Sequence, residues 1–94
     1  MDTQLYKVQH DGTGQKFFIP LADDEAVLAY TQINDMLDVH TLLVPTGMEE
    51  FEEKLIEAAF DYVASSHMKI IPTHEKVQEY AENHPEVKKF ITSI

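Results

Sequence analysis

The chain of 94 residues contains neither cysteine nor arginine, and each absence excludes a class of function. Without cysteine there is no disulfide framework, no thiolate nucleophile and no cysteine-ligated zinc or iron–sulfur centre. Without arginine the chain lacks the planar donor group that binds phosphate and guanine in a bidentate manner. The absence of cysteine also agrees with a reducing compartment.

Positive charge is scarce. The chain has seven lysines against 17 acidic residues, so its formal net charge is −10. Nucleic-acid binding needs a basic stripe to neutralise phosphates, so we expect no nucleic-acid partner. Anionic membrane surfaces are disfavoured for the same reason. Apolar runs are also far shorter than the ~20 residues of a membrane span. The first residues show no targeting signal, so we expect a cytoplasmic protein without membrane association.

Glycine and proline are few and fall singly between patterned segments, so no linker, repeat or low-complexity tract is visible. Hydrophobic residues make up 44% of the chain, which is enough to fill one core. A chain of this length supports one small domain. We therefore expect a single domain over residues 1–94.

The first half of the chain has the composition and alternation of β-strands. Leu5, Tyr6 and Val8 predict a first short strand. Turn-forming residues follow at positions 11–14, and residues 16–19 predict the strand that completes a hairpin.

Two longer strands are expected next, over residues 26–33 and 37–44. Asn34 and Asp35 between them suit a tight turn, so these strands extend the hairpin into a four-stranded antiparallel meander. Pro45 ends the fourth strand because proline cannot donate to a sheet ladder.

The second half changes to a helical period after Gly47, which predicts a helix over residues 48–66. Residues 68–71 are apolar and bounded by proline, so we expect a buried fifth strand parallel to the fourth. A second helix is predicted from Thr73 or His74 until Pro85 breaks it, with a last turn after it. The expected fold is α+β in the order ββββαβα: antiparallel strands, a βαβ unit and a C-terminal helix.

Three segments resemble the small single-domain branch of the GNAT superfamily, the acetyl-CoA-dependent N-acetyltransferases. Residues 40–45, His-Thr-Leu-Leu-Val-Pro, are similar to the end of that family's fourth strand. Residues 55–60 and 69–72 are similar to its central helix and fifth strand. Tyr80, followed by His-Pro-Glu at residues 84–86, is similar to its C-terminal motif. The resemblance covers residues 26–90 and implies a GNAT-like mixed sheet.

The resemblance implies acetyl-CoA as the cofactor, bound where the fourth and fifth strands part. The backbone of Leu43 and Val44 would pair with pantetheine. A glycine-rich loop before the central helix would wrap the pyrophosphate with its N–H groups, and Gly47 is the remnant of that loop in this chain.

The pyrophosphate loop departs from the family's pattern, since it has no basic residue and no paired glycines. Residues 45–53 instead carry four glutamates. A carboxylate about 7 Å from a phosphate charge costs roughly 0.6 kcal/mol in water before screening. The alternative is that these glutamates simply form a favourable helix start on a solvated face.

Histidine and tyrosine supply the catalytic candidates. His74 stands where the family has a cysteine after the fifth strand, and its imidazole would serve as a general base or would be a surface residue of the helix start. His40, in the fourth strand, is either a base or a structurally satisfied histidine. Tyr80 is either a general acid or a packed aromatic residue.

The five histidines show no metal-ligand spacing, so no metal site is expected. Three functions stay open. The first is an N-acetyltransferase acting on a small amine or a basic peptide, which the negative charge would attract. The second is an inactive GNAT-fold binding or regulatory module that has lost tight CoA binding. The third is an acidic mimic that binds basic partners by charge. The protein would be a monomer or a homodimer.

Overall fold

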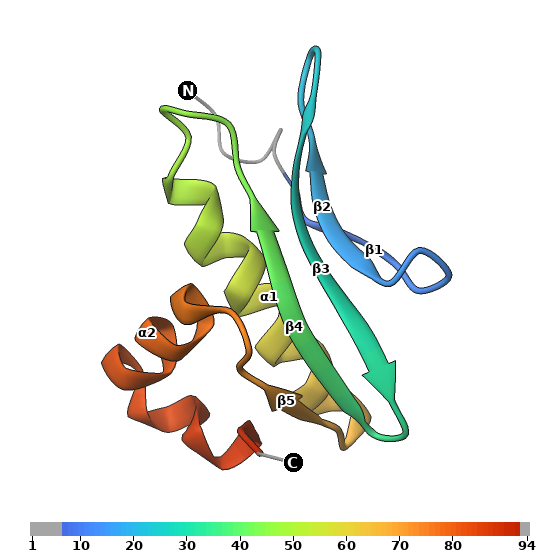
Figure 1. Cartoon of the computed structure of the whole chain (residues 1–94), viewed down its shortest axis with the longest axis vertical. Coiled ribbons are helices and arrows are strands. Elements are labelled where there is room, and N and C mark those ends of the chain that lie inside the picture. The colour runs from blue at the N-terminus through green and yellow to red at the C-terminus, as the bar shows by residue number, and fades with distance from the viewer. Residues whose placement is uncertain (1–6, 93–94) are drawn as a thin grey trace.

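The computed structural model describes residues 7–92 as one five-stranded sheet with helices packed on it (Figure 1). The strands are β1 (Gln9–Asp11), β2 (Lys16–Pro20), β3 (Glu25–Ile33), β4 (Met36–Leu43) and β5 (Lys69–Ile71). The helices are α1 (Glu50–Ser66), α2 (Glu75–Asn83) and the 3₁₀ helix η2 (Pro85–Phe90). Within residues 7–92, no helix combines the length and apolar character needed to span a membrane.

The sheet is mixed, with the spatial order β1-β2-β3-β4-β5. The first four strands pair antiparallel, and β5 pairs parallel to β4. Parallel neighbours require a long crossover, which α1 provides between β4 and β5. The α+β class and the parallel fifth strand are therefore confirmed.

The core lies between α1, α2 and one face of the sheet. Leu28, Leu37 and Ile70 on three different strands are completely buried, as are Leu55 and Val63 on α1. Their positions follow the two periods of the sequence, because alternate strand residues and every third or fourth helix residue face inward. Burial of these side chains from both layers holds the helices on the sheet.

The first strand lies later than predicted. Leu5 and Tyr6 fall outside the described residues, and β1 begins at Gln9, not at an apolar position. Within β1, His10 pairs with Phe17 across the hairpin and stacks on its ring at a centroid distance of 4.3 Å. The turn shifts accordingly to residues 12–15.

A β-bulge interrupts the pairing of β3 with β4. Ala29 is opposite Thr41 and Tyr30 is opposite Val39, so His40 is the extra residue. A bulge bends its strand and changes the face and edge to which later residues point. Leu42 therefore contacts the core, whereas Leu43 points outward with 64% of its surface exposed.

Strand β5 pairs only with the first residues of β4: Lys69, Ile70 and Ile71 are opposite Met36, Leu37 and Asp38. The chain then turns away at Pro72, and the last backbone bond between the two segments runs from the His74 N–H to the Val39 carbonyl at 2.9 Å. In Figure 1, β4 continues well beyond the end of β5. Within the part of the chain that the structure describes, the second half of β4 thus has a strand neighbour only on its β3 side.

The helices begin close to the predicted positions. Helix α1 starts at Glu50, two residues later than expected, and ends at Ser66, where His67 adopts a left-handed conformation with φ 57°. Helix α2 begins after His74, which is its N-cap. The expected last turn is η2, and Ile91 after it bridges to Ile70.

Replacing Leu28 by alanine should lower the free energy of unfolding by about 3 kcal/mol, because it leaves a cavity in a completely buried site. The matched control is Leu43→Ala on the exposed outer face, which should change stability by no more than about 0.5 kcal/mol. Urea unfolding of both variants measures the difference. Equal losses would contradict the assignment of the two faces of the sheet.

Candidate functional site

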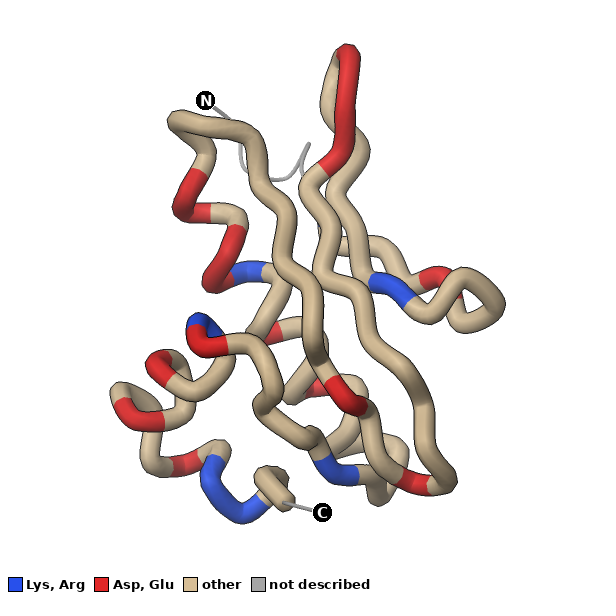
Figure 2. The backbone as a smooth tube through the Cα atoms, in the orientation of Figure 1, with Lys and Arg blue, Asp and Glu red and all other residues tan. Residues whose placement is uncertain are grey.

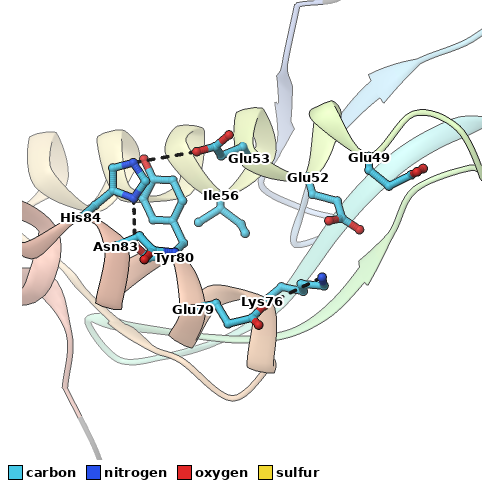
Figure 3. Close-up of a pocket in the computed structure, with 9 residues that line it drawn as sticks. All are labelled: Glu49, Glu52, Glu53, Ile56, Lys76, Glu79, Tyr80, Asn83 and His84. Carbon is cyan, nitrogen blue, oxygen red and sulfur yellow. Dashed lines mark hydrogen bonds and ion pairs between the residues drawn. The ribbon is translucent and has the colours of Figure 1, made fainter.

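A groove of about 220 Å³ lies between the first half of α1 and helix α2 (Figure 3). Both walls of the groove are helical. On each helix the lining residues lie on one face, because residues spaced three or four apart are neighbours on the helix surface. The lining residues are Glu49, Glu52, Glu53 and Ile56 from the α1 side and Lys76, Glu79, Tyr80, Asn83 and His84 from the α2 side.

The groove is strongly negative. Four of its lining residues are glutamates, against a single lysine, Lys76. The Lys76 ammonium lies 3.9 Å from the Glu79 carboxylate, so part of its charge is already balanced. Figure 2 shows that acidic residues continue along the first turns of α1. The groove therefore attracts cations and repels anions.

Tyr80 forms an aromatic wall at one end of the groove. Its ring stacks between Phe60 of α1 and His84, at centroid distances of 5.6 and 4.0 Å. Burial raises the pKa of the Tyr80 phenol, and nearby carboxylates led by Glu57 and Glu53 raise it further. Tyr80 is therefore a packed, protonated phenol at neutral pH, and its position supports the packing interpretation.

His84 connects α2 to α1 at the same end. Its Nδ1–H donates to the Tyr80 carbonyl at 2.9 Å, and its Nε2 lies 3.9 Å from a Glu53 carboxylate oxygen. A carbonyl can only accept, so this bond fixes the proton on Nδ1. His84 is thus bonded to the last turn of α2 and lies near Glu53 of α1.

The loop before α1 is closed by its own glutamate. Gly47 has φ +89°, a conformation that favours glycine, and its N–H donates to Glu49 Oε2 at 2.6 Å. The Met48 N–H donates to the Pro45 carbonyl at 3.1 Å. Two of the loop amides are therefore already bonded within the protein.

The predicted pantetheine-binding residues lie at the end of β4. Leu43 is opposite Val27 in the β3–β4 pair, and Val44 is half-buried just after the strand. In β3, the Tyr30 N–H donates to the Gln15 carbonyl and therefore points toward β2. Backbone groups point alternately to the two sides of a strand, so those of the odd-numbered β3 residues point toward β4. By this alternation Leu43 pairs with Val27, and the backbone groups of Leu42 and Val44 point away from β3.

His74 is the N-cap of α2. Its Nδ1 accepts a hydrogen bond from the Lys76 N–H at 3.1 Å, and its backbone N–H bonds to Val39. An N-cap acceptor satisfies one of the free amides of the first helical turn. The neighbouring Thr73 hydroxyl donates to the Asp38 carboxylate, which fixes the same turn.

His40 is exposed on the outer face of the sheet. Its two ring nitrogens lie 3.0 and 2.8 Å from the hydroxyl oxygens of Thr31 and Thr41. These contacts give the bulge residue two polar partners. His40 and His74 thus have separate partners, and neither lines the groove.

Of the groove residues on the α2 side, the sequence analysis singled out Tyr80 and His84 but not Lys76, Glu79 and Asn83. Lys76, Glu79, Tyr80 and Asn83 follow a spacing of three, four and seven residues, which places them on one helix face. That spacing is visible in the sequence. The approach of this face to the glutamates of α1 depends on tertiary packing and is not.

A second polar cluster lies on the sheet around His10. Its Nε2 lies 2.6 Å from the Tyr30 hydroxyl, and its ring contacts Phe17 and the edge of Tyr62. Burial lowers the pKa of His10, and the Asp11 charge opposes this in part. Burial also raises the pKa of Tyr30. The cluster is therefore most stable with a neutral imidazole and a neutral phenol.

None of these clusters has the composition of a metal centre. Over residues 7–92, no group of three or more histidine, aspartate or glutamate side chains is arranged to hold a metal ion.

The His10 cluster makes stability depend on pH. Because the folded-state pKa is below that of an unfolded histidine, its stabilising contribution is present above about pH 6.5 and is lost as the pH falls through the folded-state value. Between pH 7.5 and 5 the melting temperature of His10→Phe should therefore fall less than that of the wild type.

The matched control is His67→Asn, since His67 lies outside the cluster and asparagine tolerates its left-handed conformation. Melting curves of the control should follow the wild-type dependence on pH. An identical slope for His10→Phe and the wild type would contradict the assignment.

Comparison with known proteins assigns no family to the chain. No protein-family model matches it, and no curated protein sequence matches it. The geometry and charge of the described residues therefore carry the functional argument.

Proposed function

We propose that the protein is a GNAT-like binding module that has lost tight binding of CoA. The element order, with antiparallel strands followed by a βαβ unit, supports the GNAT resemblance of the sequence. The observation that carries the loss of the cofactor is the bond from the Gly47 N–H to the Glu49 carboxylate.

This bond puts a carboxylate where the resemblance implies the cofactor pyrophosphate. An N–H group at a helix start binds a phosphate well only when it is free and no negative charge competes for it. To bind there, a diphosphate would have to displace Glu49 and then stand beside the displaced carboxylate. Both steps weaken binding.

The groove adds to this repulsion. Glu52 and Glu53 follow Glu49 on the same helix end, and Lys76, the lysine that lines the groove, is held by Glu79. The −10 charge of the whole chain acts in the same direction. A CoA molecule carries several phosphate charges and therefore meets a site of the wrong sign.

The catalytic candidates also lack the support that a general base needs. A base is normally oriented by a second group, commonly a carboxylate. The hydrogen bonds of His40 and His74 within residues 7–92 go to threonine hydroxyls and backbone groups. These bonds favour structural roles for both residues.

One observation favours the second candidate, an acetyl-CoA-dependent N-acetyltransferase that acts on an amine. The backbone groups of Leu42 and Val44 face the side from which β5 has turned away. An edge of this kind accepts hydrogen bonds from an extended ligand such as pantetheine. The same binding experiment separates the two functions.

Acetyl-CoA at concentrations up to about 1 mM should not raise the melting temperature of the wild-type protein at low salt. The triple variant Glu49→Gln/Glu52→Gln/Glu53→Gln should bind at least tenfold more tightly, because three repelling charges are removed from the groove. Thermal-shift titration measures both.

The control variant Glu75→Gln/Glu82→Gln/Glu86→Gln removes the same charge outside the groove lining and should behave like the wild type. Micromolar binding by the wild type would favour the acetyltransferase and contradict our proposal. Unchanged binding in the groove variant would contradict the electrostatic argument.

A further inference from the structure

Among residues 7–92, no strand pairs with the second half of β4 on the side away from β3, so this part of β4 is an open sheet edge within the described residues. Pairing with β5 ends at Asp38, and the turn after β5 makes its last recorded bond to Val39. Four more residues of β4 follow up to Leu43, paired only with β3. Proteins normally shorten, cover or charge such edges because an unpaired edge binds another strand.

The bulge at His40 determines which backbone groups are available there. Before the bulge, the backbone groups of Leu37 and Val39 point toward β5. After the bulge, Thr41 and Leu43 pair with β3. The backbone groups of Leu42 and Val44 therefore point to the open side. An extended chain laid along this edge would therefore meet the amide and carbonyl groups of Leu42 and Val44 in the spacing of a β-ladder.

Apolar side chains lie beside the same edge. Among residues 7–92, Leu43 and Met48 are the large hydrophobic residues with the highest exposure, at 64% and 37%. Leu43 and Val44 also line a hollow of about 420 Å³ with Val27 and Pro45. A strand added at this edge would cover part of this exposed apolar surface.

The charges around the edge determine the kind of strand. Asp24 and Glu25 line the hollow beside Leu43 on the β3 side of β4, across the strand from the open edge, and Glu49 follows Val44 by five residues at the start of α1. In Figure 2, acidic segments flank the end of β4 on both sides. The nearby Lys16 is paired with Glu25 at 2.9 Å, which balances only one of these carboxylates.

From these observations we infer that the open edge of β4 binds an extended, lysine-rich or arginine-rich segment of another protein as an added β-strand. Backbone bonds to Leu42 and Val44 provide the pairing. Alternate basic side chains lay their apolar stems over Leu43 and reach the carboxylates with their charged ends. The inference rests on the proposed binding function and names its partner.

Other occupants of the edge fit less well. A second copy of the chain would bring a net charge of −10 against an edge that is itself flanked by carboxylates. The pantetheine of CoA would pair with the same backbone, but its phosphates would meet the glutamates of α1. A basic segment satisfies both the hydrogen-bonding and the charge requirement.

The test is a titration of the full chain with a ten-residue synthetic peptide of alternating lysine and valine or threonine, followed by backbone amide NMR shifts. The largest shifts should lie at Leu42 and Val44, and the dissociation constant of the peptide should be in the micromolar range. A peptide with glutamate in place of lysine should bind at least tenfold more weakly.

A third peptide keeps the lysines but carries two adjacent N-methylated residues at its centre. Adjacent amides point to opposite edges, so this change blocks strand pairing from either side without changing the charge. It should also bind at least tenfold more weakly. Equal binding would show simple charge attraction and overturn the inference, as would the absence of binding by the first peptide.

Dimerisation through β4 in the absence of peptide, seen by light scattering and by protection of the Leu42 amide, would also overturn the inference. Acetyl-CoA is titrated into a parallel sample to separate the two proposals. If neither the peptide nor acetyl-CoA binds, the added-strand inference is rejected and the proposed loss of CoA binding stands. Micromolar binding of acetyl-CoA at Leu42 and Val44 rejects the proposed function as well.

Discussion

The pairing of β5 with the first three residues of β4 is the constraint on which the rest of the structure depends. Leu37 and Ile70 face each other in this ladder and both are completely buried, so the contact joins the sheet to the core under α1. Because β5 is so short, the chain leaves the sheet at Pro72 and begins α2 after His74. Helix α2 is thereby placed against α1, and the far half of β4 is left without a second neighbour. The groove and the open edge are both consequences of one short parallel ladder.

Negative charge dominates the first turns of α1, and the binding that we propose follows from it. Glutamates near a helix N-terminus are favoured by the helix dipole, so they stabilise the helix locally. The same residues line the groove, and one of them occupies the Gly47 amide. A helix start that would otherwise attract an anion is therefore filled by the protein's own carboxylate. The result favours cationic partners over phosphate-bearing ones at this end of the molecule.

The sequence predicted the elements whose pattern is strong and missed those that depend on tertiary contacts. The long strands, the parallel β5 and the start of α2 at His74 follow from alternation, helical period and proline positions, and the structure has them. Leu5 and Tyr6 of the predicted first strand lie outside the described residues, and the strand that is described, β1, begins at Gln9, one residue after Val8. Its central residue, His10, contacts Phe17 and Tyr30 and gives no apolar pattern in the sequence. The bulge at His40 has no signature in a single sequence, yet it decides which backbone groups face the open side. The sequence analysis noted the glutamates of α1 and also Tyr80 and His84, but it did not predict that α1 and α2 bring them together with Lys76 and Glu79 in one groove. The GNAT resemblance and its cofactor stay predictions.

Within residues 7–92, β4 is paired on both sides in its first half and on one side in its second. Backbone amide hydrogen exchange, followed residue by residue by NMR on the free protein, tests it most directly. Leu37 and Leu42 lie on the same strand and their N–H groups point to the same side, so their comparison removes differences between strands. We expect strong protection of the Leu37 amide and exchange of the Leu42 amide close to the rate of an unstructured chain. Equal protection of the two amides would show that the edge is covered and would contradict the account.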